Sequence, residues 1–346
     1  MKKSSFQLPR IICTVLLICS VQVVTAQNLK LTNFAIWGGG ASPTTYNSAQ
    51  GVFIGNTANI QGDIGSNHLV DIKNNLNLNG NIYSGNRVVF VDFAKITGNI
   101  FANRMGTTLS PTISGNNRDT ITGNLTANGK ISLNSGRITG TVAVPAPANT
   151  NYTGPAPSGG VVTTLTLPTM PSMPNNTPFD NQVGTATITN TQTISPGLFR
   201  KLALTGNRTL TFKGPGNYIF NEVDNGTTTN KFVFDFNNTS TGTINIFIIK
   251  DARWGSLSVS TVRGNFPSRI FTEVHGNGST FGGNSFVLRG PTSIPAGSNV
   301  WLGNVWAPNG GILIENTLPS ATPHIIGALW SAKLVTVKND LRLVYT

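Results

Sequence analysis

Side chains able to do catalytic chemistry are few and scattered in this sequence. Its 346 residues contain 12 acidic side chains, 24 lysines and arginines, and three histidines. His68, His275 and His324 each stand alone, without the spacing of a metal-binding pair and without a neighbouring serine or cysteine motif. The sequence therefore predicts no metal site, no cofactor and no catalytic residue.

One group of carboxylates has a spacing that suits polysaccharide cleavage. Lyases and hydrolases built on parallel β-helices use carboxylate pairs or clusters on one wall. Glu222 and Asp224 are two residues apart, so a strand would place both on one face, where Asp235 and Asp251 could join them. A turn beginning at Asn225 is an equally natural interpretation, so a carbohydrate-active enzyme is an alternative and not the leading hypothesis.

Amide and hydroxyl side chains, in contrast, recur with a regular period. A short pattern centred on glycine appears five times, with spacings of 18, 18, 25 and 17 residues between the glycines. The five are Gly62, Gly80, Gly98, Gly123 and Gly140. Repetition at a nearly fixed period is typical of a stacked-repeat fold. If the repeats stack in register, equivalent side chains form columns with a spacing of about 4.8 Å.

Two of these columns form the candidate binding face. One column starts at Asp63 and the other at Gln61, on either side of the first glycine. The candidate binding residues are Asn79, Asn81, Thr97, Asn99, Thr122, Asn124, Thr139 and Thr141. Stacked asparagines can also hydrogen-bond along a column as amide ladders, and this purely structural role is the alternative.

A second threonine array is a weaker candidate. Threonine occupies every other position over nine residues, so a single strand would turn all five side chains to one side. The five are Thr185, Thr187, Thr189, Thr191 and Thr193. Regular threonine arrays can order water, which makes ice binding an alternative function.

The element that must hold these columns is a β-solenoid. Glycine is abundant at 38 residues, charged residues make up 10%, and no window after about residue 30 has convincing helical periodicity. Period-two alternation places Ile60, Gly62 and Ile64 on the inward face, with the glycine marking a bend or a close approach. We predict an all-β fold, a right-handed parallel β-helix that is discontinuous.

The N-terminus has the pattern of a cleaved secretory signal. Lys2, Lys3 and Arg10 precede an apolar run from Ile11 to Val24, which is short for a membrane span. The two cysteines both lie within this segment, so the mature chain has no disulfide. We expect a secreted or bacterial cell-surface protein without a transmembrane segment in the mature chain.

Composition divides the chain into four segments. Residues 1–26 are the signal, and residues 27–147 are an N-terminal solenoid half that opens with a capping strand. Residues 148–180 are a proline-rich linker that crosses the surface, because proline cannot feed a sheet ladder. Residues 181–346 are the C-terminal half, whose glycine motifs at Gly303 and Gly327 continue the pattern of the first half.

The charge balance is basic but dispersed. The formal net charge is +12, yet the lysines and arginines occur singly and are not interleaved with aromatic residues. This distribution favours solvated surface charge over a binding patch. We therefore expect no nucleic-acid partner.

Several short motifs resemble a known bacterial family. The stretches 34–36 and 60–65, the turn and strand at 215–220, and the closing coils at 303–314 and 327–337 carry the resemblance. They resemble the ice-binding-like adhesin family, which implies a discontinuous right-handed β-helix. The closing coils also resemble surface domains of the choice-of-anchor A type. The long helix of ice-binding members is not evident, and the proline-rich segment stands in its place.

Together these features predict a non-enzymatic adhesin or extracellular structural module that acts through a flat Asn/Thr-rich face. The expected partner is an extracellular surface, a glycan or ice. Trp301, Trp306 and Trp330 offer a second binding surface, or else they serve as core and cap residues. Ice binding and polysaccharide binding or cleavage are the alternatives.

Overall fold

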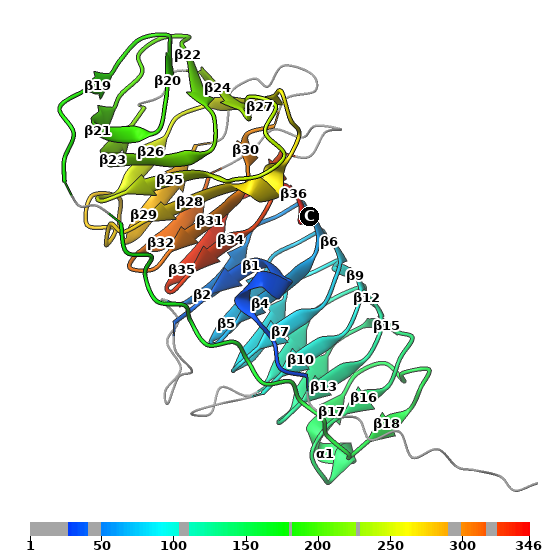
Figure 1. Cartoon of the computed structure of the whole chain (residues 1–346). Coiled ribbons are helices and arrows are strands. Elements are labelled where there is room, and N and C mark those ends of the chain that lie inside the picture. Colours follow the sequence, from blue (N-terminus) through cyan, green and yellow to red (C-terminus); the bar gives the residue numbers. More distant parts are fainter. Residues whose placement is uncertain are drawn as a thin grey trace, which may run out of the picture.

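The chain forms a parallel β-helix, as predicted (Figure 1). The computed structural model describes residues 27–40, 50–103, 111–179, 182–225, 229–289, 299–315 and 324–346. The predicted signal, residues 1–26, lies outside them. Each regular coil contributes one short strand to each of three walls, here named A, B and C, and strands of neighbouring coils pair in parallel.

Wall A runs the full length of the solenoid. Its strands, in spatial order, are β18 (Val161–Val162), β16 (Val142–Ala143), β13 (Leu125–Ala127), β10 (Ile100–Ala102), β7 (Ile82–Ser84), β4 (Asp63–Ser66), β1 (Phe34–Gly38), β34 (Leu329–Ser331), β31 (Asn304–Ala307), β28 (Ile270–Val274) and β25 (Ile244–Ile248), followed by the first parts of β23 (Gly216–Asp224) and β21 (Gly197–Leu202).

Wall B lies beside it and joins it through the two long strands β21 and β23, which bend from one wall into the other. Its other strands are β17 (Tyr152–Thr153), β14 (Ile131–Leu133), β11 (Ile113–Gly115), β8 (Arg87–Phe90), β5 (Leu69–Ile72), β2 (Gly51–Ile54), β35 (Leu334–Val337), β32 (Gly311–Ile314), β29 (Asn284–Leu288), β26 (Ala252–Trp254) and β19 (Thr187–Ile188).

Wall C consists of an eight-stranded and a four-stranded sheet. The larger contains β15 (Gly136–Ile138), β12 (Asp119–Thr122), β9 (Lys95–Thr97), β6 (Leu76–Asn79), β3 (Ala58–Gln61), β36 (Arg342–Val344), β33 (Ile325–Ile326) and β30 (Trp301–Leu302). The smaller contains β27 (Leu257–Val262), β24 (Asn230–Asp235), β22 (Thr209–Lys213) and β20 (Gln192–Ile194). Short helical turns occur at η1 (Leu31–Asn33), α1 (Ala148–Asn151) and η2 (Pro267–Arg269).

The core is a stack of identical positions. On wall A, the inward residues of six neighbouring coils are aligned and fully buried: Ile36, Ile64, Ile82, Ile100, Leu125 and Val142. Each buried aliphatic side chain contributes roughly 1.5–3 kcal/mol. The C-terminal half uses larger rings, such as Phe212, Phe232 and Trp254, which pack edge to face. The described residues contain no cysteine, so coil stacking and not disulfides holds them together.

The N-terminal strand lies in the middle of the solenoid, so the prediction of a cap there was wrong. Strand β1 pairs with β4 on one edge and with β34 on the other. The first half grows from β1 toward β18, and the second half returns from the opposite end and closes on β1 (Figure 1). Both edges of β1 are therefore paired, and no open edge is left to cover.

A proline-rich strap connects the two far ends. The ladders of the first half extend to β18, and residues 163–179, which we call the strap, then run along the solenoid toward β19 (Figure 1). The strap is extended and lies beside the N-terminal segment, where the Leu29 N–H donates to the Thr169 carbonyl at 3.1 Å. The predicted proline-rich excursion between halves is confirmed, but its predicted start at residue 148 was wrong, because β17 and β18 continue the ladders of the first half.

Candidate functional site

The repeated glycines form the corner between walls C and A. Gly62, Gly80 and Gly98 have φ values of 124°, 158° and 152° and lie between two strands. The predicted bend at Gly62 is present, but Gly62 lies at the corner between β3 and β4 and not at an inward strand position as predicted. A Cβ on Gly98 would lie 2.1 Å from the Gly80 carbonyl oxygen, and one on Gly80 would lie 2.3 Å from that of Gly62. The close approach comes from the neighbouring coil and not from the opposite wall.

The asparagine column directly after this corner caps backbone groups. The Asn81 side-chain oxygen accepts the Asn99 N–H at 2.8 Å, and the Asn99 oxygen accepts the Asn124 N–H at 2.9 Å. The column ends with the Thr141 N–H, which donates to the Asn124 oxygen at 2.8 Å. These contacts give the column a structural role, but the asparagines bond to backbone N–H groups of the next coil and not to one another as the predicted amide ladder.

Asp63 begins this column and carries its charge. Its carboxylate accepts the backbone N–H of Asn81 at 2.7 Å. Burial raises the Asp63 pKa, and the hydrogen bonds from Asn81 oppose that rise. Burial and the nearby Asp63 charge together raise the Tyr83 pKa to about 12.

The second predicted column lies on the outer face of wall C. Gln61 is in register with Asn79, Asn79 with Thr97, and Thr97 with Thr122. These four side chains are exposed, and Thr139 follows in the next coil as a half-buried residue. Three of the sequence-predicted threonines, Thr97, Thr122 and Thr139, therefore share one aligned face, whereas Thr141 belongs to the asparagine column.

A neighbouring column on the same face was not predicted from the sequence. It lies two residues before the first and contains, in register, Arg342, Asn59, Asn77, Lys95, Thr120 and Arg137. The period-two alternation that fixed the first column also implies this one. We call these two columns, from Asn59 to Thr139, the wall C face.

The second threonine array does not form one surface. Thr187 lies in β19 on wall B, and Thr193 lies in β20 on wall C, with a corner between them. The five side chains are exposed, but the prediction of a single strand was wrong. Thr191 instead uses its hydroxyl oxygen to accept the Thr209 N–H at 3.1 Å.

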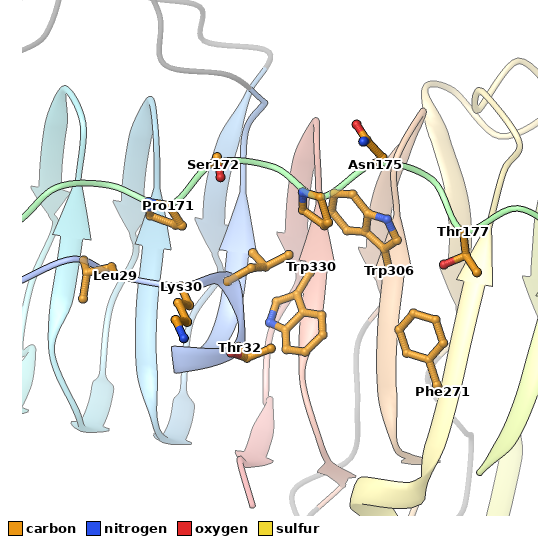
Figure 2. Close-up of a pocket in the computed structure, with 12 residues that line it drawn as sticks. Leu29, Lys30, Thr32, Pro171, Ser172, Asn175, Thr177, Phe271, Trp306 and Trp330 are labelled. Atoms are coloured by element: carbon orange, nitrogen blue, oxygen red, sulfur yellow. The ribbon is translucent and has the colours of Figure 1, made fainter. Parts of the chain in front are cut away.

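The three tryptophans are core and cover residues. Trp301 lies inside the coil with its centroid 5.1 Å from that of Trp254. Trp306 and Trp330 project from the outer face of wall A and are buried under the strap and the N-terminal segment (Figure 2). They line a cavity of about 410 Å³ with Phe271 and Pro171.

The four acidic candidates for catalysis have separate partners. Glu222 lies 2.5 Å from the Lys201 ammonium, and Asp224 lies 2.7 Å from the Arg253 guanidinium. Asp235 pairs with Arg263, whose hydrogen bond lowers the Asp235 pKa. The carboxylate of Asp251 accepts backbone N–H groups at 2.8 and 2.9 Å.

The histidines remain apart from one another. His275 contacts the buried Glu273 at 2.7 Å, and burial lowers the pKa values of His68 and His324. The described part of the chain contains no group of three His, Cys, Asp or Glu side chains that could hold a metal ion. Within the same residues, no helix has the length and apolar character needed to cross a membrane.

Comparison with known proteins gave no match to a family model, to a curated protein or to a solved structure.

Proposed function

We propose that this protein is a non-enzymatic, secreted or cell-surface recognition module that binds an extended partner through the wall C face. This proposal rests on the observation that the face holds two aligned columns of mainly exposed amide, hydroxyl and cationic side chains. Wall A is unsuited to this role because the strap covers much of its outer surface.

The chemistry of the face supports binding to a polar polymer or surface. Amide and hydroxyl groups donate and accept hydrogen bonds, and their repeat along the solenoid axis matches a partner that also repeats. Asn79, Thr97 and Thr122 are free of the backbone-capping role that occupies the asparagine column. An adhesin that holds a glycan or another extracellular surface needs such an array and needs no catalytic group.

A matched pair of double variants tests this proposal. Thr97→Tyr with Thr122→Tyr places two bulky rings on the wall C face, and tyrosine suits a strand. Ser114→Tyr with Ser132→Tyr does the same at two aligned positions of wall B. Binding of residues 27–346 to bacterial cells and to a panel of insoluble polysaccharides should fall about tenfold or more, roughly 1.4 kcal/mol, for the wall C variant only. Equal binding by both variants would contradict the proposal.

Ice is the second candidate partner, favoured by the aligned threonines Thr97, Thr122 and Thr139. The same three proteins should be compared for inhibition of ice recrystallisation. Inhibition that is present in the wild type and lost only in the wall C variant would identify ice as the ligand. A wild-type protein that neither shapes ice nor slows its recrystallisation ends this alternative.

A further inference from the structure

We propose that the partner of the wall C face is an anionic polysaccharide that runs along the solenoid axis, with its carboxylates on Lys95 and Arg137. This inference rests on the proposed function and specifies its ligand. Both side chains are exposed, and both lie in the column of the face that runs from Asn59 to Arg137, with Thr120 between them.

The face is unbalanced in charge. Among its ten members from Asn59 to Thr139, Lys95 and Arg137 are charged and the other eight are neutral. The acidic side chains near this face accept backbone hydrogen bonds instead. Asp119 is 2% exposed and accepts the Ala94 N–H at 2.9 Å. Asp63 and Asp92 stand at the two corners.

Those corner carboxylates are committed to the fold. Asp63 accepts the backbone N–H of Asn81, and Asp92 accepts that of Asn117 at 3.0 Å. The two cations are consequently left facing solvent on a surface whose other groups offer only neutral hydrogen bonds. Complementarity with a negatively charged partner follows from this arrangement.

The spacing of the cations favours a polymer with one acid per disaccharide. Lys95 and Arg137 are two coil steps apart, roughly 9.6 Å at the usual strand spacing. An extended β-linked chain that alternates a uronate with a neutral sugar repeats on about this length. Its neutral sugars would then meet the amides and hydroxyls of Asn77, Asn79 and Thr97.

A single-stranded nucleic acid is a poorer fit for the same charges. Proteins that bind such strands stack the bases on aromatic side chains. The wall C face has no aromatic member between Asn59 and Thr139. Phe93, at the neighbouring corner, lies below the Arg118 guanidinium, 5.4 Å from it.

The test uses residues 27–346 with hyaluronan oligosaccharides, with the same oligosaccharides after carboxyl reduction, and with poly(dT). Calorimetry at low salt should show hyaluronan binding at least fivefold tighter than its reduced form. Lys95→Gln with Arg137→Gln should abolish that difference, while Lys130→Gln with Arg200→Gln removes two cations elsewhere and should preserve it. Added NaCl should weaken hyaluronan binding by the wild type. The Lys95→Gln with Arg137→Gln variant should lose most of this salt dependence.

Three results would overturn the inference. They are no binding to hyaluronan, equal affinity for the charged and reduced oligosaccharides, and tighter binding to poly(dT) that the Lys95→Gln with Arg137→Gln variant abolishes. Failure here is distinguishable from failure of the proposed function. The tyrosine variants report whether the face binds at all, and the glutamine variants report whether charge selects the ligand. Melting curves confirm that each variant is folded.

Discussion

At the scale of single residues, the glycine corners accept no other residue type without strain. Gly98 combines a positive φ of 152° with a carbonyl oxygen 2.1 Å from where a Cβ would lie. The neighbouring backbone is itself locked in the ladder, so it cannot move away at low cost. The corner therefore requires glycine for two separate reasons, conformation and space.

Gly98→Ala should lower the free energy of unfolding by about 3 kcal/mol, because strain and backbone clash add. Gly206→Ala is the matched control. Gly206 also has a positive φ, 70°, but no atom lies within 4 Å of its Cβ position. That change should cost only about 1 kcal/mol. Urea unfolding measures both, and equal losses would show that the contact between coils is unimportant.

Asp119 gives the fold a pH-dependent weakness. Burial raises its pKa to about 6, the Asp92 charge adds to the rise, and the Ala94 N–H opposes it. A raised carboxyl pKa favours folding in the protonated state, so this contribution is complete below about pH 3.8 and is lost as the pH rises through about 6. Asp119→Asn should therefore stabilise the protein more at pH 7.5 than at pH 4, by about 1–2 kcal/mol after allowance for solvent screening.

Asp235 is the control with the opposite sign. Its hydrogen bond with Arg263 lowers its pKa, so its contribution is present above about pH 3.8 and is lost as the pH falls. Asp235→Asn should accordingly cost more stability at pH 7.5 than at pH 3. Urea unfolding at each pH gives both comparisons. Parallel pH profiles for the two variants would contradict the assignment.

At the scale of elements, the strap is the cover of the outer face of wall A. The outward column there includes Tyr83, Trp330, Trp306 and Phe247. Such an apolar column would be costly in water. An extended proline-rich chain suits it, since proline has no N–H to satisfy. The Thr177 N–H anchors the strap by donating to the fully buried Glu273 at 2.8 Å.

Two tryptophans of the same coil distinguish the cover from the core. Trp306→Ala should loosen the strap and speed its cleavage by protease, with a smaller effect on global unfolding. Trp301→Ala should cost about 3–5 kcal/mol of global stability, because it empties the coil interior. Limited proteolysis followed by mass spectrometry, beside thermal melting, separates the two effects. Selective strap cleavage in the Trp301 variant would contradict this division.

At the scale of the whole molecule, the two halves of the chain stack into one solenoid in which the order of the coils differs from their order in the sequence. Strands β34, β35 and β36 of the last coil pair with β1, β2 and β3 of the first. The N-terminal segment and the C-terminal strand meet at this seam, where the Tyr345 hydroxyl donates to the Thr32 carbonyl. The strap is the only long crossover that the described residues require.

A circular permutant tests this view of the architecture. Joining residue 346 to residue 27 by a flexible linker that spans from the seam to the start of the N-terminal segment, and opening the chain within the strap at residue 165, would give one uninterrupted solenoid. We expect a cooperative transition with a Tm within several degrees of the wild type, because the coil contacts are unchanged. A permutant opened at Gly98, inside a corner, is the control and should be much less stable. Failure of only the strap permutant would show that the intact strap is essential.

The repeat alone determined much of this protein. Period and alternation are local properties, and they identified the parallel β-helix, the inward aliphatic positions and the aligned Asn and Thr columns. Gly62 shows the limit of this reasoning, because a corner and an inward position look alike in a pattern of alternating residues. The capping role of the asparagines was likewise open until their partners in the next coil were known.

Only the tertiary structure decided which surfaces are available. Trp330 and Phe34 are 296 residues apart, yet the Trp330 indole N–H donates to the Phe34 carbonyl at 2.7 Å at the seam. No local sequence pattern encodes such a pairing. The pairing of the last coil with β1 places the first strand in the middle of the solenoid. Stacking likewise split the Thr185–Thr193 array across a corner, while it gathered Lys95 and Arg137 from separate coils onto one face. Local sequence fixes each coil, but the order of coils and the cover of each wall follow from long-range burial.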